Sequence, residues 1–475
     1  MRIVFIEPPK DFWFVMGEYL PPPTACIQLA SYLELKRPQD EITVIDCQAE
    51  NLDWKHLEKK LISLQPNVAA VSSLSTCNTY TVVRTFETVK RAVPNVVTIT
   101  GGQHFTALAE PSLREYPMID VIVRGEGEET IVDFINAMEK GSNYSEIMGL
   151  SYRHGDKIFS NPPRPLIQNL DYLPMPDYKF VENNMSQYHF KLMAGKKRYM
   201  IVEGSRGCDH NCNFCTQCAF WGHRWRSKSG KRIAEEMEHL HNEFDTEFIW
   251  LTDDNFTFNT RSMDLISELK EKRLGEELFW FVQMRVDDIA KNPEAVSEMS
   301  RAGNQWVLLG VESGDPETLA LWRKGTKPEQ AKNAIRLLDE NNIFSQATMI
   351  IGNRKDTHES IEKLRQYINT LNPGLAIFMV LTPYPGTELY EEASRNGWIQ
   401  NTNWADYDMV HAIMPTETLS TIEVQEELYQ CYRSFYGKWS RRIDGIFSGN
   451  IFKRRTYQYM VSQNIVRELR NLVYI

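Results

Sequence analysis

Short apolar runs alternate with amphipathic stretches over the N-terminal part of the chain. Four stretches place apolar residues at helical spacing: 24–35, 52–64, 80–92 and 128–139. Between them lie runs rich in β-branched residues that are short enough to be buried strands: 3–6, 43–45, 68–72, 96–100 and 121–123. This alternation predicts a five-stranded, doubly wound parallel sheet, whose ligands bind at the carboxyl ends of the strands.

The same alternation returns from Met200 onward. Six apolar runs, each followed by a helical pattern, are candidate strands: 200–203, 248–251, 279–284, 306–311, 345–351 and 375–381. Six β/α units form part of a barrel whose full form has eight, and the chemistry of such barrels lies at the C-terminal ends of the strands. Beyond Leu389 the pattern becomes helical and aromatic, which predicts a small helical cap that could cover the barrel mouth.

Prolines interrupt any regular period between these two regions, as in Asn161-Pro162-Pro163-Arg164-Pro165. Such density favours extended and turn conformations, so this stretch is predicted to be an ordered connector. The fold class is therefore α/β with a helical C-terminal region. The expected segments are a sheet domain at 1–148, a linker at 149–197, a partial (β/α)6 barrel at 198–388 and a helical domain at 389–475.

Composition and charge narrow the class of protein. A chain of 475 residues that is 42% hydrophobic is expected to bury two or three cores. The net charge of -10 disfavours nucleic acid as an obligatory partner. No stretch reaches the roughly 18 consecutive apolar residues that a membrane span needs. Several of the eight cysteines crowd into one loop, which is typical of a reducing, cytoplasmic compartment.

The densest chemistry lies in that loop, where Cys208, Cys212 and Cys215 are spaced C-x3-C-x2-C directly after the first barrel strand. Three thiolates this close can bind three corners of a 4Fe-4S cluster and leave one iron open to a small molecule. A zinc site that adds Cys218, His210 or His223 is the alternative, but it lacks the second pair of ligands that zinc sites usually have. Cys218 either closes the cluster or remains a nearby thiol.

Small and hydroxyl residues follow two strands of the first sheet. Ser72-Ser73-Leu74-Ser75-Thr76 comes after the third strand, and Gly101-Gly102-Gln103-His104 comes after the fourth. Glycine permits backbone conformations and close approaches that a side chain would block. A bulky ligand or a tight turn explains the glycine pair equally well.

These two loops together resemble the cobalamin-binding domain, whose signature is S-x-L followed by G-G. Pro21-Pro22-Pro23 and Gly125-Glu126-Gly127-Glu128 also match radical enzymes that carry this domain in front. The resemblance implies cobalamin contacts at Ser72, Leu74, Ser75, Thr76, Gly101, Gly102, Gln103, Gly125 and Glu126. The D-x-H-x-x-G motif of many members is missing from residues 7–13, so we expect a cobalt whose lower face is not ligated by histidine.

The C-x3-C-x2-C loop of a six-unit barrel, with Phe214 before the last cysteine, resembles the radical S-adenosylmethionine (SAM) superfamily. The resemblance implies that Cys208, Cys212 and Cys215 bind a 4Fe-4S cluster whose open iron chelates SAM. Strand-end residues would complete the SAM site: Phe214, Asp253, Asp254, Arg285, Glu312, Ser313, Lys324 and Gly352. Helix caps, surface charges and turns are the structural alternatives for several of them.

Both resemblances together imply a cobalamin-dependent radical SAM methyltransferase of the class B type. Such an enzyme methylates an unactivated carbon of a small molecule or protein residue, through a 5'-deoxyadenosyl radical and methylcobalamin, under anaerobic conditions. An electron donor such as ferredoxin or flavodoxin is implied as a partner. Trp404, Tyr407 and His411 are the candidate substrate residues.

Three other functions remain open at this stage. The first is a cyclase of the anaerobic tetrapyrrole type, which uses both cofactors without moving a methyl group. The second is a tRNA methylthiotransferase, in which Cys26, Cys47 and Cys77 would bind a second cluster. The third is a sensor that docks a partner through the basic C-terminal region, although a sensor would not need a whole SAM site.

Overall fold

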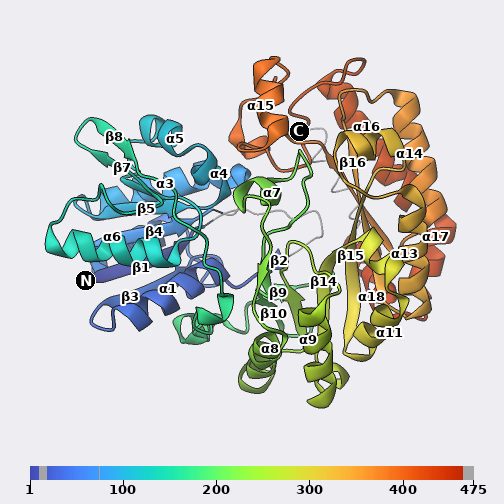
Figure 1. Ribbon diagram of the computed structural model, residues 1–475, viewed down its shortest axis with the longest axis horizontal. Coiled ribbons are helices and arrows are strands. Elements are labelled where there is room, and N and C mark those ends of the chain that lie inside the picture. The colour runs from blue at the N-terminus through green and yellow to red at the C-terminus, as the bar shows by residue number, and fades with distance from the viewer. Residues whose placement is uncertain (10–18, 74, 464–475) are drawn as a thin grey trace.

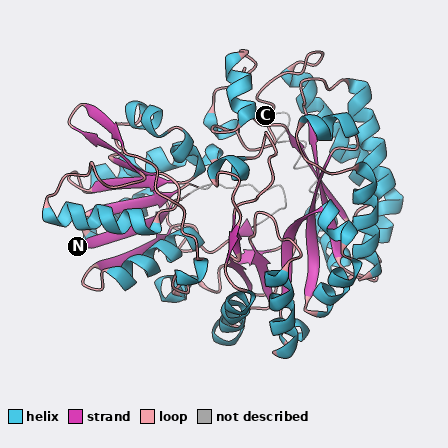
Figure 2. Ribbon diagram, in the orientation of Figure 1, coloured by secondary structure: helices cyan, strands magenta, loops and turns pink. Residues whose placement is uncertain are grey.

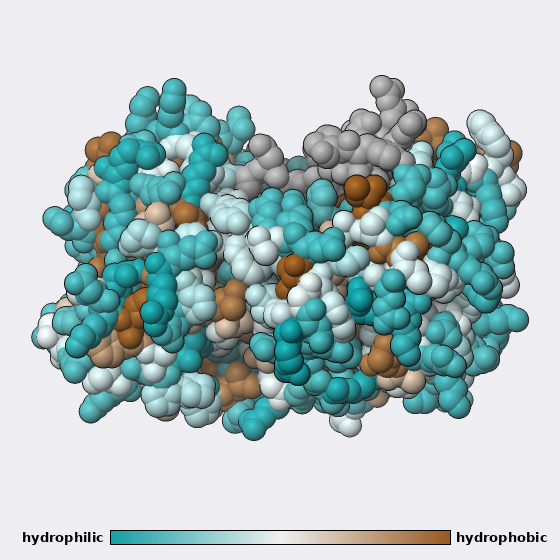
Figure 3. All heavy atoms as spheres, turned by 90° about the horizontal axis from the view of Figure 1, so that it is seen from above, coloured by the Kyte–Doolittle hydropathy of each residue, from teal (hydrophilic) through white to brown (hydrophobic). Residues whose placement is uncertain are grey.

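The computed structural model describes residues 1–9, 19–73 and 75–463. It has two α/β halves, and helix α7 (Thr216–Phe220) lies between them (Figure 1). Seen from above, the surface is mainly hydrophilic with separate hydrophobic patches (Figure 3). Within the described ranges, no helix combines the length and the apolarity that crossing a membrane requires.

The N-terminal half contains the five predicted parallel strands, and their order is β3-β1-β4-β5-β6. The strands are β1 (Arg2–Glu7), β3 (Glu41–Asp46), β4 (Val68–Ser72), β5 (Val97–Gly101) and β6 (Val121–Val123). The helices are α1 (Thr24–Lys36), α2 (Trp54–Leu64), α3 (Thr79–Ala92), α4 (Gln103–Ala107), α5 (Ala109–Glu115) and α6 (Glu128–Lys140). Because β1 pairs with both β3 and β4, the strand order reverses there, and the loops after β4 and β5 share one edge.

The beginning of the predicted connector is regular structure, where extended and turn conformations were expected. Residues after Gly149 form the antiparallel hairpin β7 (Leu150–His154) and β8 (Lys157–Ser160), which extends the first sheet beside β6. Gly155, with φ +57°, sits in the turn between the two strands. Tyr152 stacks on Phe159 with ring centroids 5.4 Å apart. The prolines that suggested irregular structure come only after this hairpin.

The second half is a six-stranded parallel sheet in chain order, with helices on its outer side (Figure 2). The strands are β10 (Tyr199–Val202), β13 (Phe248–Leu251), β14 (Phe279–Arg285), β15 (Asn304–Glu312), β16 (Phe344–Ile351) and β17 (Leu375–Val380). The helices are α8 (Gly230–Phe244), α9 (Thr260–Glu271), α10 (Val286–Lys291), α11 (Pro293–Arg301), α12 (Pro316–Leu321), α13 (Pro328–Glu340), α14 (His358–Leu371) and α15 (Glu388–Arg395). The predicted partial barrel is confirmed.

Two short ladders accompany the main sheets. Strand β2 (Tyr19–Leu20) pairs with β9 (His189–Phe190), so the connector returns to the beginning of the chain. Strand β11 (Ser205–Arg206) pairs with β12 (Arg226–Ser227) and closes a loop that contains all the cysteines of the C-x3-C-x2-C motif. Residues 204–218, which include β11 and the cysteines that follow it, are called the cluster loop below.

The C-terminal helices α16 (Thr421–Tyr436), α17 (Trp439–Ile446) and α18 (Ile451–Gln463) confirm the helical region but not its expected place. Helix α16 covers the edge strand β17, where the Tyr432 hydroxyl accepts from Phe378 N and donates to Phe378 O, at 3.2 and 2.9 Å. Phe452 of α18 packs against Phe248 and Phe279 at the N-terminal ends of their strands. These three helices therefore seal an edge and the bottom of the barrel, whereas Trp404, in the same C-terminal region, lies against His104 of the N-terminal half.

Candidate functional site

The cluster loop begins directly after β10, at the C-terminal end of the barrel. Gly207 has φ +87°, and a Cβ atom there would lie 2.1 Å from Arg224 O, so only glycine fits. Cys212 is buried, while Cys208 and Cys215 are partly buried. Backbone bonds tie the loop to its surroundings, since Asn213 N donates to Trp322 O and Asn213 O accepts from Leu389 N.

Cys218, whose role the sequence left open, lies in α7 beside the thiols of Cys208, Cys212 and Cys215. Its contact lowers the pKa of each of these three thiols, to about 6 for Cys212. Because the thiolate is the form that binds metal, this donor set fits an iron-sulfur cluster. The structure thus places Cys218 next to each of the three cysteines of the motif.

The two predicted aspartates after β13 contact the backbone of the cluster loop. Asp253 is fully buried, and its Oδ1 accepts from Gly204 N at 3.1 Å while its Oδ2 accepts from Arg261 at 2.8 Å. Asp254 accepts from Gly207 N at 2.9 Å, and burial raises its pKa to about 7. Both side chains therefore shape the loop, and their predicted bond to the methionyl amine stays a prediction.

A second polar cluster lies beside Cys212 at the ends of β14 and β15. Lys324 Nζ donates to Glu312 Oε1 at 2.8 Å, and Thr348 Oγ1 donates to Glu312 Oε2 at 2.9 Å. Arg285 donates to Lys324 O at 2.6 Å. Burial would lower the pKa of Lys324, but the charge of Glu312 outweighs it and the pKa is raised. Arg285, Glu312 and Lys324, which are predicted to contact SAM, thus meet at one place although they span about 40 positions of the chain.

Backbone strain at Glu312 supports a functional role for this polar cluster. Glu312 has φ +65°, a left-handed conformation that is costly for a residue with a side chain. A Cβ atom at Gly310 would lie 2.7 Å from Lys324 Nζ and 2.8 Å from Glu312 Oε1, so the missing side chain makes room for the ion pair. A glycine inside a strand pattern was the signal that sequence reasoning did not use.

The remaining SAM candidates are more dispersed. Phe214 packs edge-to-face on Trp322, with ring centroids 5.4 Å apart. Ser313 Oγ accepts from Asp315 N at 3.1 Å at the start of α12. Gly352, with φ +85°, donates its N–H to Asp356 at 2.9 Å at the end of β16. These contacts are compatible with turn and cap roles, and their contacts to SAM stay predictions.

The glycine pair after β5 is required by crowding of the backbone. A Cβ atom at Gly102, which has φ +99°, would lie 1.8 Å from Ser73 O, and one at Gly101 would lie 2.7 Å from Val123 O. The loops after β4 and β5 are therefore pressed together, with only hydrogen atoms between them. We call this pair of loops, 72–76 and 101–104, the glycine edge.

Several small polar groups line the glycine edge. Ser72 and Ser75 are half-buried, and Thr76 is buried in the short 3-10 turn Thr76–Asn78. Leu74 lies outside the described residues. The His104 side chain is 1% exposed, its Nδ1 has no hydrogen-bond partner among the described residues, and burial lowers its pKa to about 4. A neutral imidazole with an unused nitrogen at this edge fits a site that takes a polar cofactor.

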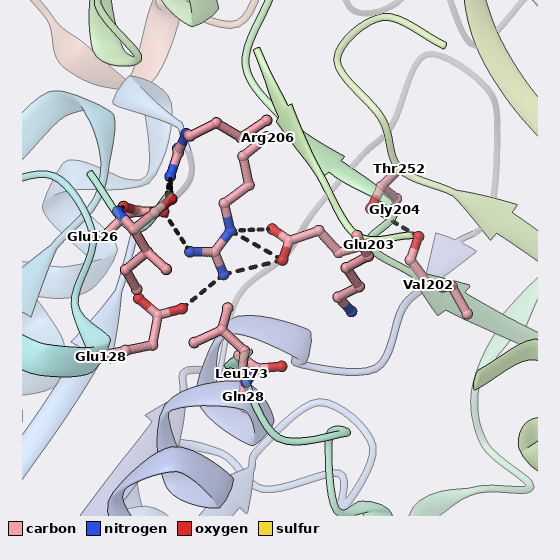
Figure 4. A network of polar contacts seen from close by, with 12 residues as sticks. Gln28, Glu126, Glu128, Leu173, Val202, Glu203, Gly204, Arg206 and Thr252 are labelled. Carbon is pink, nitrogen blue, oxygen red and sulfur yellow. Dashed lines mark hydrogen bonds and ion pairs between the residues drawn. The ribbon is translucent and has the colours of Figure 1, made fainter. Parts of the chain in front are cut away.

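Three predicted cobalamin residues instead contact protein groups. Gln103 Nε2 donates to Gln217 Oε1 of α7 at 2.9 Å. Gly125 N donates to Thr106 Oγ1 at 3.1 Å. Glu126 accepts from Arg206 and Arg226, both at 2.8 Å, within a network that joins the two halves (Figure 4). In this arrangement Gln103 and Glu126 bridge the halves, and a direct contact to cobalamin stays a prediction for them.

The three substrate candidates lie between α15 and α16. The Trp404 ring meets the His104 ring at 4.9 Å, which places this segment against the glycine edge. Tyr407 is 1% exposed and donates to Asn401 O at 3.2 Å. His411 bonds Asp408 at 2.9 Å, and this bond raises its pKa. Among these three, Trp404 is the one whose ring contacts a described residue of the predicted cofactor loops, His104.

The cysteines of the alternative second cluster lie in different cores. Cys26 belongs to the core on one face of the first sheet, with Ile27 and Leu33. Cys47 belongs to the core on the other face, with Leu57. Their packing in two separate cores explains the burial of both cysteines without a cluster that joins them to Cys77.

Comparison with known families agrees with this geometry. The radical SAM superfamily matches residues 202–368, and the B12 binding domain matches residues 18–135. The chain belongs to the cobalamin-binding radical SAM enzymes. The matched domains bind a 4Fe-4S cluster with SAM, and cobalamin, so the three expected cofactors are confirmed at the level of domains.

Relatives align along most of the chain. An uncharacterized methyltransferase of Pyrococcus horikoshii is 32% identical over 461 residues, which are 96% of this chain and 97% of the relative. An anaerobic magnesium-protoporphyrin IX monomethyl ester cyclase of Cereibacter sphaeroides is 31% identical, over 92% of this chain and 71% of the relative. Among solved structures, the radical SAM methyltransferase TsrM of Kitasatospora setae covers both chains fully, with a TM-score of 0.72 and 15% identity. The likeness to TsrM concerns the fold.

Proposed function

We propose that the protein is a cobalamin-dependent radical SAM methyltransferase that methylates an unactivated carbon. The full-length similarity to a relative that is named a methyltransferase carries this proposal. The bound cofactors would supply hydrogen-atom abstraction and a transferable methyl group. The chain's own part is to hold the cofactors at fixed places and to keep water and oxygen away from the reacting carbon.

On the cluster side, we propose Cys208, Cys212 and Cys215 as the cluster ligands. The strained Glu312 and the buried Lys324 offer one carboxylate and one ammonium group beside Cys212. These two groups suit the hydroxyl, amine and carboxylate groups of SAM, because each can accept from or donate to one of them. Asp253 and Asp254 keep the loop backbone in place through Gly204 and Gly207.

On the cobalamin side, we propose that the glycine edge holds the cofactor. Its glycines let the loops after β4 and β5 pack closely without protruding side chains, and His104 offers a neutral nitrogen that no described residue uses. Trp404 would form part of the substrate pocket, because its ring lies against His104. Tyr407 and His411 are proposed to support this segment.

A cyclase of the anaerobic tetrapyrrole type is the second candidate, because a relative of that name is 31% identical over 92% of this chain. Both functions use the same cofactors, so the products must separate them. A reductant of the ferredoxin or flavodoxin class is required in either case.

The test is a reaction of the anaerobically reconstituted protein with SAM that carries a trideuterated methyl group. Lipid, tetrapyrrole and small-metabolite extracts are offered separately, and products are followed by mass spectrometry. We expect 5'-deoxyadenosine and S-adenosylhomocysteine in matched amounts, together with a product that gains the label. Deoxyadenosine without S-adenosylhomocysteine would contradict methyl transfer and support the cyclase. Cys208→Ala is the control and should give neither product.

A further inference from the structure

The cluster loop is joined to the N-terminal half on both sides of its cysteines. Before Cys208, Arg206 donates to Glu126 at 2.8 Å and to Glu128 at 2.7 Å. After Cys215, Gln217 accepts from Gln103 at 2.9 Å. Glu126 and Glu128 follow β6, and Gln103 follows β5, so both bridges start from the edge of the sheet that carries the glycine edge.

The bridge at Arg206 is a buried charge network, which Figure 4 shows from close by. The side chains of Arg206, Glu126 and Glu128 are 7, 4 and 4% exposed. Glu203 accepts from Arg206 Nε at 3.1 Å. Arg226 is a second cation that donates to Glu126, at 2.8 Å. The planar guanidinium of Arg206 thus binds carboxylates on three sides.

Such a network tolerates little displacement. An unpaired charge in a buried site is far more costly than an exposed one, so the two halves cannot separate at this point without exposing or orphaning charges. The planar fork of N–H donors on an arginine fixes both the direction and the length of its hydrogen bonds to carboxylates. Arg206 precedes Cys208 by only two residues, so a shift at the network moves the proposed cluster ligands.

We infer that Arg206 with Glu126 and Glu128 positions the cluster relative to cobalamin, and that Gln103 with Gln217 fixes the same spacing from the other side. The five are positioning residues, because they act through the two loops and not on the substrate. The inference rests on the proposed cofactor sites but not on methyl transfer. Two cofactors that act on one substrate need such a constraint, because misplacement by about 1 Å costs rate steeply.

The contrast within the same chain is Lys179, which forms an ion pair with Glu34 at 2.7 Å between the connector and α1. These side chains are 50 and 39% exposed. Exposed pairs contribute little and are screened by salt. Lys179→Gln is therefore the matched control for loss of an ion pair outside the buried network.

The experiment measures the distance between the two metal centres. The full chain is loaded anaerobically with iron, sulfide and hydroxocobalamin, and reduced so that cluster and cob(II)alamin are both paramagnetic. Pulsed electron paramagnetic resonance then gives the distribution of iron-to-cobalt distances, and metal analysis gives the iron and cobalt content of each variant.

We expect one narrow distribution in the wild type and in Lys179→Gln. Arg206→Gln should broaden it at unchanged metal content, Arg206→Lys should restore it in part, and Gln217→Ala should broaden it to a smaller extent. An unchanged distribution in both Arg206→Gln and Gln217→Ala overturns the inference. If Arg206→Gln does not fold, Gln217→Ala decides alone.

Small-angle scattering of the protein without cofactors is a second measurement. We expect the radius of gyration to rise in Arg206→Gln but not in Lys179→Gln, and the absence of a rise overturns the inference even where metal loading fails. A failure to methylate any substrate would leave both measurements unaffected, so this inference and the proposed function fail separately.

Discussion

The two proposed cofactor sites, the cluster loop and the glycine edge, are called platforms here. They differ in the groups that form them. Around the cluster loop, side chains form the site, since four thiols meet there and buried ions such as Lys324 and Glu312 stand beside them. At the glycine edge, the backbone forms the site, because Gly102 and Ser73 approach too closely for any side chain. The first platform should therefore be sensitive to loss of charge, and the second to the addition of a single methyl group.

The largest effect is expected from Lys324→Met, which removes the cation but keeps most of the volume. It leaves Glu312 buried without its ion-pair partner, and loss of one partner of a buried pair typically costs about 3–5 kcal/mol. Chemical denaturation of the variant measures this loss.

The control for this prediction is Lys363→Met, which breaks an ion pair with Glu359 whose side chains are 70 and 79% exposed. Exposed pairs of this type are screened by solvent and contribute little to stability. Equal losses of stability in the two variants would show that the cluster platform does not depend on buried charge.

A slightly smaller effect is expected from Gly102→Ala on the other platform. The left-handed backbone and the contact with Ser73 O together should cost roughly 2–5 kcal/mol. Gly141→Ala is the matched variant, because Gly141 is also left-handed, with φ +62°, but has no atom within 4 Å of an added Cβ.

We expect Gly141→Ala to cost only about 1–2 kcal/mol, since backbone strain is its one penalty. Thermal unfolding of both variants measures the difference. If Gly102→Ala were as stable as Gly141→Ala, the crowding at the glycine edge would not be a constraint.

A dependence of stability on pH is expected outside both platforms, at Asp46, which lies at the end of β3 and accepts from Tyr188 at 3.0 Å. Burial raises the pKa of Asp46 from 3.8 to about 6. The folded chain therefore binds this proton more tightly than the unfolded chain, so its contribution to stability is lost as the pH rises from about 4 to about 6.

At about 1.4 kcal/mol per pKa unit, this loss is roughly 2–3 kcal/mol. Asp46→Asn does not titrate, and we expect its stability relative to the wild type to rise over that pH range and then stay level. Denaturation curves between pH 4 and pH 8 provide the measurement. A constant difference between the two proteins over the whole range would refute the assignment.

The smallest effect is expected far from both platforms, at the edge of the barrel. The Tyr436 hydroxyl accepts from Ala376 N at 2.9 Å and donates to Ala376 O at 2.6 Å. Tyr436→Phe leaves both backbone groups of β17 without this partner, which should cost about 1–2 kcal/mol. We expect unchanged binding of iron and cobalt, and altered metal content would mean that the edge is coupled to the platforms.

The sequence could predict those features of the fold and the site that leave a regular pattern along the chain. Hydrophobic periodicity placed all eleven expected parallel strands, because each is centred on a short run rich in apolar and β-branched residues between helical patterns. The cysteine motif was readable for a similar reason, since covalent ligands leave a fixed spacing in the chain. The hairpin at Leu150–Ser160 was missed although Gly155 marked its turn, because the prolines that follow dominated the pattern.

Contacts between distant segments were beyond sequence reasoning. Gln103 and Glu126 looked like cofactor residues from their motifs, yet they bond Gln217 and Arg206, which lie 114 and 80 positions away. Thr348 and Arg261 were not predicted at all, because a polar residue near a strand end has no spacing that reveals its partner. Cys218 was ambiguous until α7 placed it against the other three cysteines.

The most direct test of two separate platforms in one chain is the metal content of the anaerobically reconstituted wild type, Cys208→Ala and Gly102→Ala. We predict iron and cobalt in the wild type, cobalt without a cluster in Cys208→Ala, and iron with little cobalt in Gly102→Ala. A cluster retained in Cys208→Ala, or full cobalt binding in Gly102→Ala, would contradict this account.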